Sequence, residues 1–456
     1  MLNKNFFLAG LVACAGATAV YAQSAATNPT YRFMTNLGNI DVVLRPDVAP
    51  QTVANFLNYV NTGAYTNSIF HRLVSGFVAQ GGGYQDVGGV PLISSTSSTL
   101  VAVTANAAIP NEFNLSNTQG TIAMALTSTN GTSNANSATS EWFFNLVNNA
   151  SQLDSQLFTV FGATNAAGIT VLNKIGNLPV SDYSSVFGSD FVTLPTTGGN
   201  FVLVSSIIPL PVLTPAGFVS AASYAATSSN GVSPGEILAI FGTQMGPANP
   251  VSSAITNGAL PTSVGGTTVT FDSKPAPIFF TSANQVNVVV PYGIAGLPTV
   301  DITVTYNGTT SNAEVFQVKP ANPAIFTLNG SGMGDAVIER YPGYGSDVIS
   351  ASNPAKSGDV LILYGEGYGA PASGTSLPDG QIVTTTVPVV ADLPGVLLID
   401  GNPVPTAYFG GAPGLVNGVL QVNFTVPTLN PGSHQIQLQL GSPARTSPTG
   451  VTLQTK

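Results

Sequence analysis

The second half of the chain contains the same three sequence landmarks twice, in the same order. The first is a glycine followed by an acidic residue and then by an apolar segment with the pattern of a strand. The second is a short X-Pro-X-Pro segment, and the third is a Gln-Val-Asn strand ending in proline. The two sets are 234–242 and 357–365, 274–277 and 402–405, 285–291 and 421–427. Such a repeat predicts two copies of one structural unit.

Each copy is a run of roughly 100–120 residues with short alternating strands between turn residues, which is typical of an immunoglobulin-like β-sandwich. We therefore predict β-sandwich repeats at 217–320 and 321–456. A Pro-rich segment at 210–216 precedes the first repeat and is predicted to be a linker.

Residues 29–209 contain the only helical patterns. The segment 31–44 predicts two strands joined by a turn. Pro50 begins a predicted helix, because its missing N–H costs nothing in a first turn. A second, weaker helix is predicted at 168–175. Strands plugged by one or two helices indicate a closed barrel. The apolar stripe of the first helix consists of Val53, Phe56, Leu57 and Val60.

The charge balance argues against two classes of partner. The chain has 20 acidic and 11 basic residues, a formal net charge of −9, without runs of either sign. Nucleic-acid binding needs a basic stripe, so this composition disfavours it, and it disfavours an anionic membrane surface for the same reason. No apolar run reaches the length that would span a bilayer, so no membrane span is predicted.

Residues 1–22 have the pattern of a secretory signal peptide. An early lysine precedes an apolar stretch at 6–13, and small residues flank a tyrosine in a cleavage site that ends at Ala22. We therefore expect an exported protein, periplasmic or extracellular. The Leu-Val-Ala-Cys sequence ending at Cys14 resembles a bacterial lipoprotein box, so lipid anchoring at Cys14 is the alternative. Cleavage after Ala22 would leave no cysteine and hence no disulfide.

The richest motif is 70–82, Phe-His-Arg-Leu-Val-Ser-Gly-Phe-Val-Ala-Gln-Gly-Gly. It resembles the signature of the cyclophilin-type peptidyl-prolyl cis-trans isomerases nearly residue for residue. Stretches similar to the same family follow in its order at 120–125, 137–145, 153–154 and 159–162. The resemblance implies a mainly β fold, an eight-stranded antiparallel barrel capped by two helices. It also implies action on X–Pro bonds of proline-containing clients, without a cofactor.

This reaction requires no nucleophile and no metal. Rotation about an X–Pro bond crosses a barrier of about 18–20 kcal/mol set by amide resonance, so a catalyst need only bind the twisted amide better than the planar forms. By the resemblance, Arg72 would point its guanidinium at the prolyl nitrogen, and Gln80 and Phe77 would complete the catalytic set. The implied substrate-binding residues are His71, Val78, Ala125, Glu141, Phe143, Leu153 and Phe158.

Taken alone, these residues leave other interpretations open. The apolar ones would elsewhere be ordinary barrel core, and for His71 a structural role beside the site is favoured over a catalytic one. Glu141 stands where the family usually has glutamine, and Gln152 replaces a frequent tryptophan. In one interpretation, Glu141 points to solvent and has no role. By the resemblance, however, it should line the same groove as Arg72, where its carboxylate can pair with the guanidinium. That pairing would orient the guanidinium and also divert part of its field.

Neither a metal site nor a phosphate loop is predicted. His71 and His434 are isolated from one another in the sequence, without the ligand spacing of a metal centre, so we predict no metal and no cofactor. The glycines at 81–83 are not followed by Lys-Ser/Thr, and we predict that they form a turn leaving a strand.

The repeated region resembles a domain at the ends of many secreted proteins of soil acidobacteria, over about 217–453. This resemblance implies architecture and export but no activity. The acids Glu236, Asp359 and Asp400 stand beside predicted turns and are expected to be solvated. We expect these repeats to serve in attachment, through a cell-surface or polymer partner.

Two functions stay open. The first is an exported isomerase that speeds the folding of clients, which the intact set of Arg72, Phe77 and Gln80 favours. The second is a catalytically weak protein that binds proline peptides or adheres to a surface, which Glu141 favours.

Overall fold

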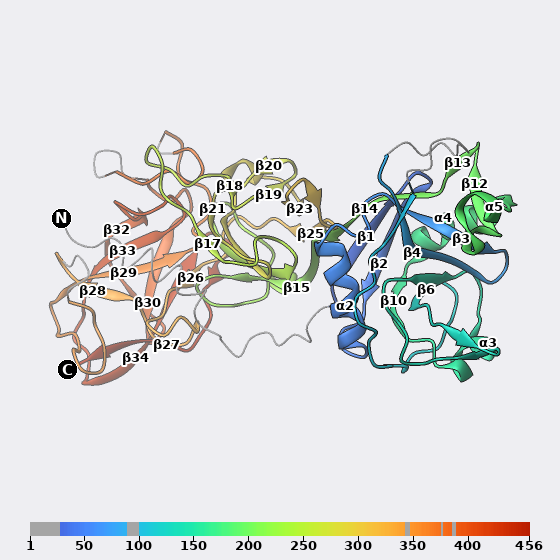
Figure 1. Ribbon diagram of the computed structural model, residues 1–456. Coiled ribbons are helices and arrows are strands. Elements are labelled where there is room, and N and C mark those ends of the chain that lie inside the picture. The colour runs from blue at the N-terminus through green and yellow to red at the C-terminus, as the bar shows by residue number, and fades with distance from the viewer. Residues whose placement is uncertain (1–27, 89–99, 343–346, 375–376, 385–388) are drawn as a thin grey trace. The chain divides into compact units, whose positions relative to one another are not determined.

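The computed structural model describes residues 28–88, 100–342, 347–374, 377–384 and 389–456. They form two compact units, Asn28–Leu210 and Pro211–Lys456 (Figure 1). The predicted signal peptide and its Cys14 lie outside the described residues. Among the described helices, none combines the length and the apolar character needed to cross a bilayer.

Eight antiparallel strands of the first unit close into a barrel, as predicted. Their order is β3–β14–β1–β2–β10–β6–β9–β4, and pairing of β3 with β4 completes the circle. A further strand, β5 (Leu100–Ala102), pairs with β4. The eight strands are β1 (Thr30–Thr35), β2 (Gly38–Leu44), β3 (Ser68–Val74), β4 (Val78–Asp86), β6 (Thr121–Met124), β9 (Trp142–Asn145), β10 (Val160–Thr164) and β14 (Leu203–Leu210). The predicted hairpin at 31–44 is confirmed as β1 and β2.

Both predicted helices of this unit are confirmed. Helix α2 (Pro50–Asn61), drawn in blue in Figure 1, begins at Pro50 and buries Val53 and Phe56 in the barrel core. The carboxylate of Glu112 accepts hydrogen bonds from the backbone N–H groups of Gln51 and Thr52, at 3.0 and 2.8 Å. Since these N–H groups have no partner within the helix, Glu112 fixes where α2 starts. The second helix is α4 (Ala166–Gly176).

Short elements connect the barrel strands. The polar segment that follows Leu126 forms a small hairpin of β7 (Ser128–Thr129) and β8 (Thr132–Ser133). The remaining elements are α3 (Ala150–Leu153), η1 (Asp154–Gln156), β11 (Val180–Ser181), α5 (Ser184–Phe187), η2 (Ser189–Phe191), β12 (Leu194–Thr197) and β13 (Asn200–Phe201).

The barrel interior is organised around Trp142, which is fully buried. Its indole packs edge-on against Phe33 and Phe70. A Cβ atom on Gly81 would lie 2.7 Å from this ring, and one on Gly82, whose φ is +81°, would lie 2.6 Å from its nitrogen. The glycines at 81–83 lie inside β4, so the predicted turn is wrong. The first two of them make room for the indole.

The second unit consists of two halves, each with two sheets. In the first half the sheets run β15–β16–β22–β21–β17 and β18–β19–β23–β24, with β20 on β19 and β25 on β23. The elements are β15 (Val212–Ser220), α6 (Thr227–Asn230), β16 (Ile237–Thr243), β17 (Val251–Ser252), β18 (Ser263–Val264), β19 (Thr267–Phe271), β20 (Lys274–Pro275), β21 (Ile278–Thr281), β22 (Gln285–Val289), η3 (Tyr292–Ile294), β23 (Thr299–Tyr306), β24 (Thr309–Thr310) and β25 (Glu314–Gln317).

In the second half the sheets run β26–β29–β33–β32, with β28 on β29, and β27–β36–β34–β30–β31, with β35 on β34. The strands are β26 (Ala324–Ile325), β27 (Gly334–Asp335), β28 (Ile338–Arg340), β29 (Val360–Glu366), β30 (Gly395–Ile399), β31 (Asn402–Val404), β32 (Thr406–Gly411), β33 (Leu420–Thr425), β34 (Gly432–Leu440), β35 (Arg445–Thr446) and β36 (Val451–Thr455). In each half, side chains from both sheets share one apolar core, as in an immunoglobulin-like sandwich.

The repeated landmarks occupy matching places in the two halves. Asn287 lies opposite Ala239 in the pairing of β16 with β22, and Asn423 lies opposite Ile362 in the pairing of β29 with β33. In each half the glutamine of the Gln-Val-Asn landmark donates a hydrogen bond to this asparagine at 2.9 Å.

The Pro-rich segment at 210–216 is strand rather than the predicted linker. Strand β14 runs through Leu210, and β15 begins at Val212. Pro215 falls between Leu213 and Phe218, where the register of β15 against β16 shifts. A proline at such an irregularity removes no ladder hydrogen bond, which is why the pattern of prolines misled the prediction.

Two fully buried carboxyl groups lie where the halves of the second unit meet. Glu366, at the end of β29, accepts hydrogen bonds from the Ser220 hydroxyl at 2.6 Å and from the backbone N–H groups of Ala222 and Ile237, both at 3.0 Å. Glu236 accepts from Asn322 of the second half at 2.9 Å. The expectation that Glu236 is solvated is therefore wrong. Ser233, three residues away, also donates to Glu236 through its backbone N–H at 2.8 Å, whereas Asn322 comes from a distant part of the sequence.

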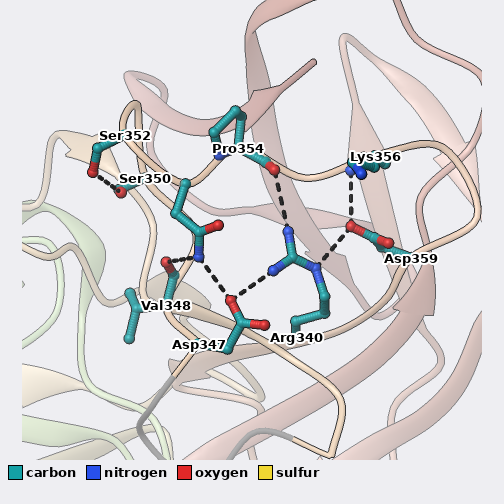
Figure 2. A network of polar contacts seen from close by, with 9 residues as sticks. Arg340, Asp347, Val348, Ser350, Ser352, Pro354, Lys356 and Asp359 are labelled. Carbon is teal, nitrogen blue, oxygen red and sulfur yellow. Dashed lines mark hydrogen bonds and ion pairs between the residues drawn. The ribbon is translucent and has the colours of Figure 1, made fainter.

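Asp359 is held in an ion-pair network rather than being free in solvent (Figure 2). The guanidinium of Arg340 contacts Asp359 at 2.8 Å and Asp347 at 2.6 Å, and donates to the Pro354 carbonyl. Asn353 donates to Asp347 at 2.7 Å. Because Arg340 contacts the loop at three places, we infer that this network stabilises the conformation of the loop.

Asp400 is also paired. Its carboxylate lies 2.6 Å from Nδ1 of His434, whose Nε2 lies 2.8 Å from the carbonyl oxygen of Asn430. Both ring nitrogens thus face acceptors, which only the imidazolium form satisfies. The hydrogen bond to Asp400 is the main reason that the pKa of His434 is raised.

Candidate active site

One row of side chains crosses five neighbouring barrel strands. Arg72 of β3 lies opposite Gln80 of β4, Gln80 lies opposite Phe143 of β9, and Phe143 lies opposite Ala123 of β6. Val160 of β10 follows Ala123. Directly opposed residues in a sheet project from the same face, so the register itself brings the predicted guanidinium, amide and aromatic ring together. The register of β3 against β4 shifts on both sides of Phe70, and these shifts place Arg72 opposite Gln80.

The apolar part of the row forms a cluster of its own, separate from the barrel core. Strand alternation separates the two, since Phe143 joins this outer cluster while its neighbours Trp142 and Phe144 point into the core. The ring of Phe158 packs edge-on against Phe143, with centroids 5.6 Å apart. The outer apolar cluster consists of Phe77, Val78, Leu115, Ala123, Ala125, Phe143, Leu153, Phe158 and Val160.

Six predicted site residues meet in the outer apolar cluster, and three members were missed. The six are Phe77, Val78, Ala125, Phe143, Leu153 and Phe158. The missed members are Leu115, Ala123 and Val160. Ala123 lies two residues before the predicted Ala125, so strand alternation was a signal that could have found it. Leu115 lies outside any regular element and gave no signal.

Three buried asparagines, Asn117, Asn145 and Asn149, form a hydrogen-bond network with the half-buried carboxylate of Asp154 at the rim of this cluster. Asn149 donates to the carbonyl of Phe77 at 2.9 Å, and Asn117 donates to the carbonyl of Phe158 at 3.1 Å. Burial raises the pKa of Asp154, but hydrogen bonds from Asn117 and Ser116 outweigh burial and leave the pKa lowered. Asn145 ends the family-like stretch at 137–145, whereas no sequence signal pointed to Asn117 or Asn149.

A polar relay, made of Arg72, Gln80, Glu141 and His71, lies beside the cluster. Nη1 of Arg72 donates to Oε1 of Gln80 at 3.2 Å, and Nε2 of Gln80 donates to Oε2 of Glu141 at 2.7 Å. The predicted direct pairing of Glu141 with Arg72 is therefore wrong, because Gln80 lies between them. Among the described residues, no carboxylate lies within ion-pair distance of Arg72.

His71 lies behind the relay rather than in the outer apolar cluster. Its side chain is 2% exposed, and its ring packs edge-on against Tyr84. Nε2 of His71 is 3.5 Å from Oε2 of Glu141. So small an exposed surface leaves little for a peptide to contact, and the structure favours a supporting role over the predicted binding role.

The charge state of Glu141 is set by opposing effects. Burial is the largest and raises its pKa, while the hydrogen bond and charge of His71 and the hydrogen bond from Gln80 lower it. The lowering effects together are larger, so the pKa lies below the usual value of 4.5. Glu141 is therefore ionised at neutral pH.

The guanidinium of Arg72, which has no carboxylate partner among the described residues, thus lies next to an apolar cluster that could receive a proline ring. Within the described parts of the chain, no group of three metal-ligating side chains gathers. The chemistry that a lone guanidinium supports is stabilisation of a developing lone pair or negative charge.

Comparison with known proteins matches one family model to the first unit and another to the first half of the second unit. Residues 30–193 match the model of the cyclophilin type peptidyl-prolyl cis-trans isomerase/CLD family, and residues 224–318 match the IPT/TIG domain. A peptidyl-prolyl cis-trans isomerase of Acinetobacter baylyi is 39% identical over 166 residues, which cover 35% of this chain and 78% of that protein. Peptidyl-prolyl cis-trans isomerase A of Dickeya dadantii is 36% identical over 177 residues, covering 38% and 84%.

Proposed function

The chain belongs to the cyclophilin-type peptidyl-prolyl cis-trans isomerase family, and on that premise we propose that it is an exported isomerase that accelerates folding of proline-containing client proteins. Its substrates are X–Pro peptide bonds. The single observation that carries the catalytic assignment is Arg72, a guanidinium without a carboxylate partner among the described residues, placed by strand register next to Gln80 and Phe143.

Catalysis follows from the difference between planar and twisted amides. In the planar form the prolyl nitrogen shares its lone pair with the carbonyl group, and twisting localises that pair on nitrogen. A guanidinium held beside the nitrogen therefore binds the twisted form more strongly, which lowers the barrier. The outer apolar cluster would hold the proline ring in place while the carbonyl side rotates.

A second candidate function rests on Glu141. If the negative charge of this residue weakens the field of Arg72, the barrel would bind proline peptides but turn them over slowly. A proline-isomerisation assay on the full chain separates the two functions. A rate no greater than the uncatalysed rate, together with measurable peptide binding, would support the second.

We expect the isolated barrel, residues 28–210, to fold and to match the full chain in kcat/KM on a short proline peptide. The reason is that it contains the whole relay and the outer apolar cluster and forms its own compact unit. The measurement is a coupled isomerisation assay on both proteins, with circular dichroism as the test of folding. A folded barrel with less than a tenth of the full-chain rate would place part of the active site in the second unit.

The second unit is proposed to attach the enzyme to a surface or polymer partner. Its first half is an IPT/TIG domain, and the matched places of Asn287 and Asn423 support a duplication that produced the second half. A crystal structure in which the strands that carry the repeated landmarks pair differently in the two halves would contradict the duplication. Export is supported by the signal-peptide pattern of residues 1–22 and by the resemblance to secreted acidobacterial proteins.

We expect a bacterial host that produces the full chain to export it with Gln23 as the first residue and to retain it on cells. Residues 1–210 alone should be exported in the same way but released. N-terminal sequencing and cell fractionation measure both outcomes. A retained intact N-terminus would refute export by cleavage, and equal release of both chains would refute attachment through the second unit. Lipidation at Cys14 would appear as a blocked, membrane-bound N-terminus.

A further inference from the structure

The mechanism proposed above gives no role to Glu141, which is a member of the polar relay. We propose that Glu141, seated against His71, is a positioning residue that fixes which way the Gln80 amide faces and thereby aims the Arg72 guanidinium. This inference rests on the isomerase function and concerns how its catalytic arginine is held.

The direction of the Gln80 amide follows from the chemistry of its two neighbours. An ionised carboxylate only accepts hydrogen bonds and a guanidinium only donates them, whereas an amide has one acceptor end and one donor end. Glu141 takes the donor end at 2.7 Å, and Arg72 takes the acceptor end at 3.2 Å. Turning the amide over would set NH₂ against guanidinium and oxygen against carboxylate. Both contacts would be repulsive, so only one direction is allowed.

Glu141 is itself held from two sides. Nε2 of His71 lies 3.5 Å from its Oε2. Gly83 lies against its other oxygen, and a Cβ atom on Gly83 would come within 2.9 Å of Oε1. The same Cβ atom would lie 3.1 Å from the ring of His71. The place of the carboxylate therefore depends on a glycine at 83, where the backbone has an ordinary φ and no conformational reason to require one.

The charged groups around Glu141 determine the pH range in which its carboxylate is ionised and holds the Gln80 amide in one direction. His71 of β3 favours the ionised carboxylate by its hydrogen bond and its charge, and Gln80 of β4 favours it by its hydrogen bond. From η2, the charge of Asp190 opposes ionisation, but the hydroxyl of Tyr84 donates to Asp190 at 2.5 Å. Tyr65 donates to the backbone carbonyl of Ser140, next to Glu141.

The balance keeps the pKa of Glu141 below its usual value of 4.5. The Gln80 amide should accordingly be held by a carboxylate from neutral pH down to that lowered pKa. Below it, the neutral carboxyl group keeps one acceptor oxygen, as a glutamine amide does. We expect kcat/KM to be constant over the neutral range and, once the carboxylate is protonated in acid, to fall no further than to the level of Glu141→Gln.

The test compares the full-length chain with Glu141→Leu and Glu141→Gln, and with Glu314→Leu in the second unit as the matched control. Glu141→Leu should lower kcat/KM at least tenfold at neutral pH, because Gln80 loses its acceptor. Glu141→Gln offers an acceptor oxygen again and should recover most of the loss, without the fall in acid. Glu314→Leu should behave as the parent. Melting temperatures show whether each variant is folded.

A second readout does not depend on turnover. The Nε–Hε NMR signal of Arg72, assigned by its absence in Arg72→Lys, should be sharp in the parent and broadened or shifted in Glu141→Leu. If the parent isomerises proline peptides and Glu141→Leu stays within twofold of it with the same Arg72 signal, the positioning role is refuted. If the parent itself does not isomerise, the isomerase function fails, and the NMR comparison alone decides whether Glu141 positions Arg72.

Discussion

Replacing Arg72 with alanine should reduce kcat/KM for X–Pro isomerisation at least tenfold, which corresponds to about 1.4 kcal/mol of lost transition-state stabilisation. Arg72 is the guanidinium at the head of the relay, and no described carboxylate neutralises it. Its removal leaves the outer apolar cluster intact, so peptide binding should change much less than the rate of turnover. Measuring kcat and KM separately tests this division.

Two variants act as controls for that experiment. Arg45→Ala removes an exposed guanidinium of the same unit that pairs with Asp47 at 2.7 Å, and exposed pairs of this kind contribute little, so activity should be unchanged. Arg72→Lys keeps the charge but loses the planar fork that faces Gln80, and its activity should fall between the parent and Arg72→Ala. A folded Arg72→Ala protein with parental turnover would contradict the mechanism.

The second unit should be more stable at pH 5 than at pH 8.5. Burial, reinforced by the charge of Glu366, raises the pKa of Glu236 to about 8, and burial raises the pKa of Glu366 to about 7. Both values lie above the 4.5 of an exposed glutamate. Their contribution to stability is therefore fully present below pH 4.5 and is lost as the pH rises through about 7 and about 8. Two such shifts amount to several kcal/mol.

Thermal unfolding of the full chain across this pH range measures the effect, and the transition of the barrel provides an internal reference. The raised pKa of His434 acts in the same direction, so a variant is needed to separate the two sources. Glu236→Gln can still accept from the Ser233 backbone and pair with a turned Asn322 amide. It should raise the melting temperature at pH 8.5 and flatten the pH dependence. An unchanged pH dependence in this variant would show that the buried acids do not control stability.

The sequence predicted well what depends on local pattern. The hairpin at 31–44 and the helix starting at Pro50 follow from alternation, helical spacing and the first-turn preference of proline, and both elements are present. The membership of the apolar site was also largely predictable, because the family resemblance names residues one by one. The members of the relay were predicted, but their arrangement was not. Register shifts on both sides of Phe70 determine that Arg72 lies opposite Gln80, and no residue type in the sequence indicates such shifts.

The failures have a common physical cause, which is contact between distant segments. Glu236 was expected in solvent because its neighbours form a turn, yet its partner Asn322 is 86 positions away in the sequence. Glu366 is satisfied by the backbone of Ala222 and Ile237, and a backbone donor has no sequence signature. The prolines at 210–216 suggested a linker because the sequence does not reveal the register shift that accommodates Pro215.

The packing of Trp142 against Gly81 and Gly82 gives the protein a built-in optical reporter. Trp142 is the single tryptophan of the chain and is fully buried in the barrel. Its indole nitrogen has no hydrogen-bond partner among the described residues, so emission from the folded barrel should lie at the short-wavelength end of the tryptophan range. Light absorbed selectively by tryptophan will report on the barrel alone, while the tyrosines of the second unit stay silent. The unfolding of one unit can thus be followed inside the intact two-unit protein, without cutting or labelling it.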